Sequence, residues 1–418
     1  MTQLSPSVSS YEPLGASDSP LSNRAALFCL LIFIAAYATN GMDRQVFPMM
    51  LPWISKTYHF DLKTAGSLST IFTLGLVIAG VPTGYLIDRW NRKTTLLIGM
   101  VIYSIFTLTT IYAIGFADML FYRAASGFGE AMQQAVLFAA AGSYFYKNKA
   151  MVFGIIQIGF GLGGALGPYL ATLMVVKTGN WHSPFVWYCI FGLIMAMVVW
   201  WAVPKTFTEN KGSAKRATEQ VAVSNIPERF WNRNSILCTM SIPFTGIMMF
   251  GYMGLYPTFL IKQLHFAPKI AAAAVGIYGF GCMFGVLGGW VGDRFSTRWT
   301  IFASYCVIMV NTYLIFSVAT QPWQHNVLSF LQGLIASSTL YPNNVSLLQK
   351  SVRPAMIGRA TGLFQVCHYT GGTAAGFLFG LLVTRIGWHQ AALIQETMFP
   401  IVGIIAMCLI REDRLLGS

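Results

Sequence analysis

Four ionisable residues lie inside long apolar stretches of the chain, where charge is rare. Asp43 and Arg44 are adjacent in one stretch, and Arg123 and Glu130 belong to "RAASGFGEA" in another. An arginine offers a planar fork of donors to a carboxylate or a phosphate. An acid at membrane depth is a common proton carrier. These four residues therefore predict a site that binds an anion and a proton.

The spacing of these residues predicts how they pair. Neighbours on a helix point about 100° apart, so Asp43 and Arg44 should have different partners. Arg123 and Glu130 are seven residues apart and share one helix face. A charged group facing lipid costs about 2.5–3.5 kcal/mol, so all four should face one another. We expect Asp43 and Glu130 to share Arg123, while Arg44 binds the substrate.

This arrangement would couple the anion to the proton. An arriving anion competes with the carboxylates for the cations, which makes those carboxylates easier to protonate. Anion and proton then favour each other's binding reciprocally. Asp43, Glu130 and Arg123 are the predicted proton-coupling residues, and either acid could be the carrier. The alternative is a structural ion network.

Further polar residues in apolar stretches are candidates for the wall of the same pocket. The first half of the chain offers Tyr37 and Gln157, and the second half offers Tyr252, Tyr256, Asn343, Asn344, Gln365, His368 and Tyr369. His368 is expected to be the only histidine inside a span, either as a proton relay or as a hydrogen-bonded core residue. Glu396 is expected near the outer membrane interface or paired, without a coupling role.

The composition is that of a membrane protein that crosses the bilayer several times. Of the 418 residues, 55% are hydrophobic and 10% are charged, whereas soluble domains carry about 25% charged residues. The seven cysteines all fall in apolar segments without a CxxC pair, so neither a disulfide framework nor a metal site is expected. The fold class predicted is an all-α membrane protein.

Hydropathy predicts twelve transmembrane helices in two six-helix bundles. The spans are 25–53, 65–87, 94–114, 118–144, 151–176, 185–203, 234–261, 271–291, 300–319, 325–349, 360–384 and 391–410. The domains expected are a disordered tail (1–23), a first bundle (24–203), a polar linker (204–233), a second bundle (234–410) and a short tail (411–418).

The basic residues orient these spans. Of the 27 Lys and Arg residues, 19 fall at ends and loops on the side of both termini, six on the other side, and two inside spans. Cytoplasmic loops carry the excess of Lys and Arg, so both termini are expected in the cytoplasm. This asymmetry explains the net charge of +13 without nucleic acid as a partner.

Two similar loops relate the halves. "GYLIDRWNRK" begins at Gly84 and "GWVGDRFSTR" at Gly289, 205 residues later. The same offset places Met248 and Met249 opposite Asp43 and Arg44. The buried Asp-Arg pair thus occurs in one half only, which favours a site over a requirement of the fold.

These loops resemble the signature loop of the major facilitator superfamily. Gly84, Asp88, Arg89, Arg92 and Lys93 match it, and Gly289, Asp293, Arg294 and Arg298 form a weaker second copy. The resemblance implies a gating role for Gly84, Asp88, Arg89, Arg92, Asp293 and Arg294.

Three further stretches resemble the anion:cation symporter branch of that superfamily. They are the Asp43-Arg44 pair, the pattern from Arg123 to Glu130, and "LYPTFL" from Leu255 to Leu260. The chain departs from the branch after Glu130, where "AMQQA" lacks the usual proline. "GLGGALGP" (161–168) resembles a glycine-proline motif of antiporters, and its small residues predict close helix packing.

The resemblance implies a proton-coupled symporter of a small organic anion, such as a carboxylate or a sugar acid. The proton is then the coupling ion, with no other cofactor, and the protein is a monomer in a bacterial cytoplasmic membrane. No GxxxxGK[ST], GxSxG or HExxH motif suggests an ATP-driven pump or an enzyme. Two alternatives are a Spinster-like exporter of lysolipids or amphipathic compounds and a nutrient sensor of the same fold that moves no solute.

Overall fold

Long apolar runs punctuated by glycine and proline fold as helices wherever the structure describes the chain. The computed structural model describes residues 21–89, 91–145, 149–209, 227–353 and 356–415, and all regular elements in these ranges are helices. The predicted tails and the middle of the predicted linker, 210–226, lie outside the described residues.

The first half of the chain forms α1 to α8. Their bounds are α1 Asn23–Tyr58, α2 Leu62–Thr70, α3 Phe72–Arg89, α4 Arg92–Thr109, η1 Thr110–Tyr112, α5 Phe116–Tyr144, α6 Lys149–Thr178, α7 Ser183–Ala202 and α8 Lys205–Thr208. A single turn residue, Ile71, separates α2 from α3, so these two helices cover the second predicted span together.

The second half forms α9 to α16 and contains more broken helices. Their bounds are α9 Arg233–Thr258, η3 Phe259–Gln263, α10 Pro268–Cys282, α11 Gly285–Arg294, α12 Thr297–Tyr313, η4 Leu314–Val318, α13 Pro322–Gln332, η5 Gly333–Leu340, α14 Tyr341–Lys350, α15 Ile357–Ala392, η7 Leu393–Met398, α16 Pro400–Leu409 and η8 Glu412–Arg414. The segments η3, η4, η5 and η7 are π-helical. Inside α15, Gly387 has φ 81° and turns the chain between the last two predicted spans.

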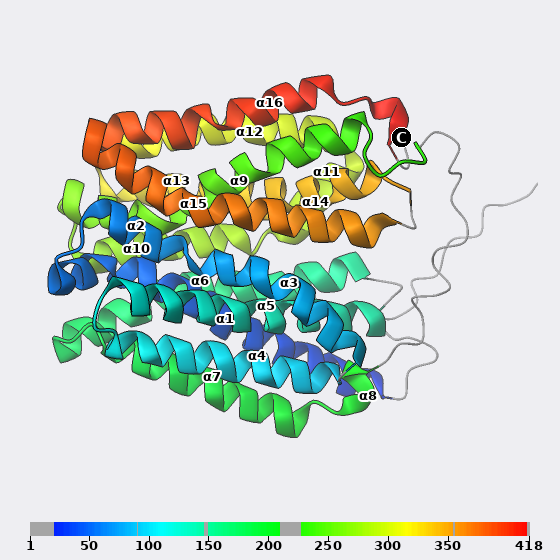
Figure 1. Cartoon of the computed structure of the whole chain (residues 1–418), viewed down its shortest axis with the longest axis horizontal. Helices are drawn as coiled ribbons and strands as arrows, with labels where there is room; N and C mark the ends of the chain where they lie inside the picture. Colours follow the sequence, from blue (N-terminus) through cyan, green and yellow to red (C-terminus); the bar gives the residue numbers. More distant parts are fainter. Residues whose placement is uncertain (1–20, 90, 146–148, 210–226, 354–355, 416–418) are drawn as a thin grey trace, which may run out of the picture.

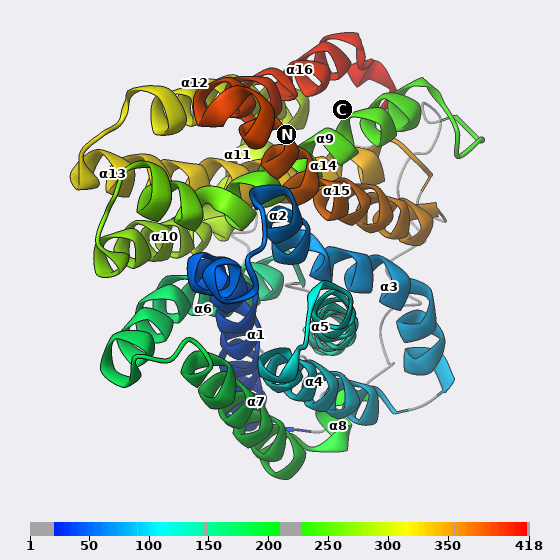
Figure 2. The ribbon, with the colours of Figure 1, turned by 60° about the vertical axis from the view of Figure 1, so that its left-hand side comes forward.

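The two sets of helices lie side by side along one long axis (Figures 1 and 2). The beginning of α1 and the end of α16 lie at the same end of the molecule (Figure 1), which we call the terminal end. The turn between α1 and α2 lies at the opposite end, the far end. The first described helix thus begins where the last one ends, which is consistent with the even number of crossings that the sequence predicts.

Not every predicted span qualifies by length and apolarity. Eight helices among the described residues are long and apolar enough to cross a membrane, or nine if the pair α10 and α11, bent by 46°, is one span. Helix α5 contains Arg123 and Glu130, and the run from α13 to α14 contains several polar residues, so a hydropathy test undercounts both. Twelve crossings and cytoplasmic termini therefore stay predictions.

The motif "GLGGALGP" packs two helices against α6, as its small residues predict. A Cβ on Gly163 would lie 2.1 Å from the carbonyl oxygen of Ala38 in α1. On another face of α6, a Cβ on Gly279 of α10 would lie 2.2 Å from the backbone nitrogen of Ala165. Glycine at these points lets the backbones approach closely. Helix α6 thereby links α1 of the first half to α10 of the second.

A second close contact joins the halves at the far end. A Cβ on Gly66 of α2 would lie 2.0 Å from the carbonyl oxygen of Gly376 in α15. Next to it, the Thr70 hydroxyl donates to the carbonyl of Thr373 at 3.2 Å, and the hydroxyls of Thr73 and Thr373 are 2.9 Å apart. Nearer the terminal end, by contrast, a Cβ on Gly80 or Gly362 would meet nothing within 4 Å.

This contrast gives a matched pair of substitutions. We expect Gly66→Ala to lower the thermal unfolding midpoint of the purified protein, because the methyl group must push the backbones of α2 and α15 apart. Overpacking of this kind costs about 1–3 kcal/mol. Gly80→Ala adds the same methyl group where nothing opposes it and should leave the midpoint within error of the parent. Equal midpoints for the two variants would contradict the backbone contact at Gly66.

Candidate substrate and proton site

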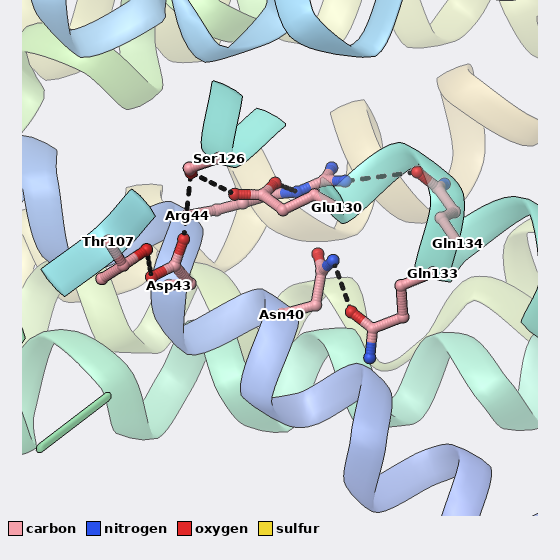
Figure 3. A network of polar contacts seen from close by, with 8 residues as sticks. All are labelled: Asn40, Asp43, Arg44, Thr107, Ser126, Glu130, Gln133 and Gln134. Atoms are coloured by element: carbon pink, nitrogen blue, oxygen red, sulfur yellow. Dashed lines mark hydrogen bonds and ion pairs between the residues drawn. The ribbon is translucent and has the colours of Figure 1, made fainter. Parts of the chain in front are cut away.

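An arginine and a glutamate form a buried ion pair between α1 and α5. The Nε of Arg44 lies 2.7 Å from Oε2 of Glu130, and Arg44 Nη2 donates to Gln134 Oε1 at 3.2 Å (Figure 3). Arg44 is 4% exposed and Glu130 is 0% exposed. Removing either side chain would leave the other charge buried without a partner, which is strongly destabilising.

Asp43 faces a different helix from Arg44, as the sequence predicts for adjacent helical residues. Its Oδ1 accepts a hydrogen bond of 2.6 Å from the Thr107 hydroxyl of α4. The Ser126 hydroxyl of α5 lies 3.5 Å from Asp43 Oδ2 and 3.4 Å from Glu130 Oε1, between the two acids (Figure 3). A proton or a water molecule exchanged between the acids would pass this hydroxyl.

The expected role of Arg123 differs from the observed one. All three side-chain nitrogens of Arg123 are buried without a hydrogen-bond partner. Its guanidinium carbon lies 4.7 Å from the ring centre of Phe47 and 5.4 Å from that of Phe72, which are cation–π distances. Arg123 interacts electrostatically with both Asp43 and Glu130, as expected, but it bonds to neither, and Glu130 forms its ion pair with Arg44 instead.

Amide side chains extend the site, and the sequence interpretation missed them. Asn40 Nδ2 donates to Gln133 Oε1 at 2.9 Å (Figure 3). Gln133 Nε2 also donates to the carbonyl of Ala36 at 2.7 Å. Gln133 and Gln134 follow Glu130 by three and four residues, the positions that share its helix face. That spacing was the signal in the sequence that could have identified them.

Tyrosines from both halves lie around Arg44. Tyr37 and Tyr369 interact electrostatically with its guanidinium, and Tyr341 interacts with Arg44 and with both of these tyrosines. Tyr37 and Tyr369 were predicted, and both lie within electrostatic range of the charged group. Tyr341 was missed because it begins α14 directly after the π-helical segment η5, where helical spacing fails as a guide.

The other two predicted tyrosines belong to a separate network inside the second half. The rings of Tyr252 and Tyr256 stack at 4.6 Å, and both hydroxyls bond to Ser329, at 3.2 and 2.8 Å. The Tyr256 hydroxyl also lies 3.1 Å from Nδ1 of His325, which is 0% exposed. His368 is thus not the only buried histidine among the described residues, since His325 lies in the first turn of α13.

The two predicted asparagines bond to backbone carbonyls. Asn343 donates to the carbonyls of Gly288 and Thr339 at 2.9 and 2.8 Å, and Asn344 to that of Leu340 at 3.1 Å. Such bonds to backbone carbonyls indicate a packing role.

His368 and the two glutamines differ from the asparagines in lacking such bonds. His368 stacks on the ring of Phe364 at 5.5 Å, and its buried Nδ1 has no hydrogen-bond partner. Gln157 buries an unpartnered Oε1, and Gln365 is exposed. Gln157 and His368 therefore keep free polar atoms that a ligand could use.

The sequence of the chain matches a known protein family. The family profile described as "Major Facilitator Superfamily" matches residues 33–376 and 244–416. The protein belongs to the Major Facilitator Superfamily. It is a multi-pass membrane transporter rather than an enzyme, and the resemblance of its loops to that superfamily is confirmed.

Several curated members of this superfamily resemble the transporter over most of its length. A hexuronate transporter of Bacillus subtilis (strain 168) is 25% identical, over 87% of this chain and 89% of that protein. The 4-hydroxybenzoate transporter PcaK of Pseudomonas aeruginosa is 22% identical, over 91% and 90%. A probable 4-methylmuconolactone transporter of Cupriavidus pinatubonensis is 25% identical, over 85% and 84%.

Solved structures share the fold of this transporter at low sequence identity. A bacterial homolog of the human lysosomal transporter Spinster, in an inward-facing and occupied conformation, superposes with a TM-score of 0.74 at 16% identity, covering 95% of this chain and 100% of that one. The nucleoside transporter NupG gives a TM-score of 0.71 at 15% identity, covering 93% and 100%. These likenesses show the fold alone.

The signature loops of the transporter are described in part. The environments of Gly84, Asp88, Arg89 and Asp293 lie outside the described part of the structure, and Arg294 is exposed. The Nη1 of Arg92 lies 3.5 Å from the carbonyl of Ala139 in α5 and 3.4 Å from that of Thr208 in α8. The gating roles of all six predicted residues stay predictions.

Lys93 and Arg298, which occupy matching positions in the two loops, make the same kind of contact. Lys93 Nζ donates to the carbonyls of Trp200 and Val203 at the end of α7, both at 2.6 Å. Arg298, 205 residues later, donates to the carbonyls of Met407 and Cys408 at the end of α16, at 2.6 and 3.0 Å. A cation at a helix C-terminus satisfies free carbonyls and the helix dipole. A basic side chain thus holds the end of α7 in the first half and the end of α16 in the second half.

Proposed function

We propose that this transporter carries a small organic anion together with a proton, by alternating access. The observation that carries the proposal is the buried Arg44–Glu130 ion pair at 2.7 Å. This pair joins the group that best recognises a carboxylate to a group that can take up a proton.

The pair couples the two ligands by competition. A substrate carboxylate that binds the guanidinium of Arg44 displaces Glu130, which then has no cation within bonding distance. The displaced carboxylate, buried between α1 and α5, takes up a proton rather than stay ionised and unpaired. When the anion leaves, Glu130 returns to Arg44 and releases the proton, so neither ligand is favoured without the other.

The charges of the site balance in both states. Without ligand, Asp43 and Glu130 offset Arg44 and Arg123. An anion with one negative charge and a proton add nothing to this sum, so the loaded site is also neutral. A neutral site can close to one side and open to the other without the penalty that a net charge in the low-dielectric interior would carry. The tyrosine hydroxyls of Tyr37, Tyr341 and Tyr369 would hydrogen-bond the rest of the substrate.

The substrate class follows from the cation and is consistent with the relatives. The named relatives carry a hexuronate and 4-hydroxybenzoate, and both of these compounds are carboxylates. The close backbone contact between α2 and α15 supports a conformation closed at the far end. We further propose a monomer in a bacterial cytoplasmic membrane, with the proton as coupling ion and neither another cofactor nor nucleic acid as a partner.

Uptake into proteoliposomes tests this function. With acid outside, we expect radiolabelled 4-hydroxybenzoate or D-glucuronate to accumulate, and we expect a protonophore to remove the accumulation. Liposomes without protein and a gradient of reversed sign are the controls. No pH response to either compound, together with binding of a lysophospholipid, would favour a lipid exporter instead. No transport of any solute would favour a sensor.

A further inference from the structure

A third buried acid among the described residues, Glu396, lies far from the Arg44 site in sequence and differs from the expectation for it. Glu396 belongs to the π-helical segment η7, between α15 and α16. It was expected near the outer interface or paired, yet it is 0% exposed and forms no ion pair with any residue that the structure describes. Single π turns in helices are often found at functional sites.

The immediate contacts of Glu396 are neutral. Its Oε1 accepts a hydrogen bond of 3.3 Å from Nε2 of Gln395, which also donates to the carbonyl of Ala375 at 3.0 Å. Its Oε2 is buried without a partner. On the α9 side, Gly251 lies so close that an added Cβ would be 2.2 Å from Glu396 Oε1. The carboxyl is therefore enclosed rather than exposed to lipid or water.

No helix packed against Glu396 supplies a cation among the residues that the structure describes. Helix α12 contributes Thr312, which bonds to the backbone carbonyl of Glu396 at 3.0 Å, and α16 contributes apolar residues. Buried titratable groups of the packed helices bond or stack elsewhere: Tyr252 of α9 on Ser329, Tyr305 of α12 on Thr245, and His368 of α15 on Phe364. The only described group that bonds to the carboxylate is the neutral amide of Gln395.

We propose that Glu396 is a second proton-binding site, which holds its proton in this conformation. An ionised carboxylate with no cation in a buried environment would cost several kcal/mol. Protonation removes that cost, and the unpartnered Oε2 is the atom that takes the proton. The site is separate from the Arg44–Glu130 pair, which has a cation, and it does not depend on the function proposed for that pair.

Helix α9 connects this site to the contact between the two halves. Gly251 covers Glu396, and Gly254, three residues later, packs on Ser69 and Thr70 of α2 in the other half. The ring of Phe250 also lies 5.8 Å from that of Phe72 in α3. When the halves separate at the far end, α9 loses these supports and its cover over the carboxyl loosens. Water then reaches Oε2, and the proton leaves to it.

Infrared spectroscopy tests the proton directly and needs no substrate. We expect the purified protein in lipid nanodiscs at neutral pH to show the carbonyl stretch of a protonated carboxylic acid. This band should disappear in Glu396→Gln and persist in Asp413→Asn, which removes an exposed acid. The same band in parent and Glu396→Gln would overturn the proposal. Glu130→Gln, recorded alongside, reports separately on the acid of the proposed function.

The thermal unfolding midpoint of Glu396→Gln gives a second test, because a protonated and an ionised Glu396 predict opposite changes. Gln is neutral and has the shape of a protonated Glu, so Glu396→Gln should keep the unfolding midpoint of the parent or raise it. A large fall, or failure to fold, would show that the carboxylate is needed in its ionised form and would overturn the proposal.

The role of α9 has its own test. In Gly66→Ala, which weakens the contact between α2 and α15, the Glu396 band should be lost at lower pH than in the parent. An identical titration of the band in parent and variant would overturn the link between the halves and the proton.

Discussion

Arg44→Ala is expected to abolish binding of organic anions while the protein stays folded. The guanidinium is the one cation of the described site that lies beside tyrosines of both halves and holds an exchangeable partner. Removing one partner of a buried, hydrogen-bonded charge pair costs about 2–5 kcal/mol, so affinity should fall on the order of 30-fold or more. Thermal-shift titration with 4-hydroxybenzoate and D-glucuronate measures this change.

Two variants separate lost binding from lost stability. Arg44→Ala leaves Glu130 buried without a cation, whereas the double variant Arg44→Ala/Glu130→Gln removes both charges and should recover the midpoint but not the ligand shift. Arg385→Ala, which removes an exposed cation of α15, should keep the full ligand shift. Equal ligand shifts in Arg44→Ala and the parent would show that Arg44 does not anchor the anion.

Glu130→Gln is expected to uncouple transport from the proton gradient. Glutamine has the shape of the protonated acid but carries no exchangeable charge, so the substrate no longer brings a proton with it. For one proton per monovalent anion, the parent should accumulate substrate about tenfold per unit of ΔpH. The variant should reach no accumulation, while exchange of labelled for unlabelled substrate continues because exchange moves no net proton.

The Glu130→Gln prediction has a control variant and an outcome that would contradict it. Glu412→Gln removes an acid that lies 4.0 Å from Arg298 outside the site and should accumulate substrate like the parent. Full accumulation by Glu130→Gln would exclude this carboxylate as the carrier. If Asp43→Asn were then the uncoupled variant, Asp43 would carry the proton, with the Thr107 hydroxyl as its partner in the ionised state.

The sequence by itself determined which residues lie at membrane depth and how each helix presents them. Hydropathy and charge placed Asp43, Arg44, Arg123 and Glu130 inside apolar helices. Charged residues are rare in such helices because their burial in a bilayer costs free energy, so the four stand out in the sequence. Helical spacing showed that Asp43 and Arg44 must face different neighbours, since that angle is fixed within one helix. The offset between the halves likewise related Lys93 to Arg298, because repeated sequence builds repeated contacts.

The tertiary structure alone decided which groups meet. Spacing along α5 gives the face that Glu130 shares with Arg123, but not the rotation of α1 that brings Arg44 to Glu130 instead. Tyr341 and Glu396 follow π-helical turns or lie in them, and these turns shift the register that periodic reasoning assumes. The burial of Glu396 depends on Gly251 of a helix about 145 residues earlier in the chain, a contact between distant segments that no local pattern encodes.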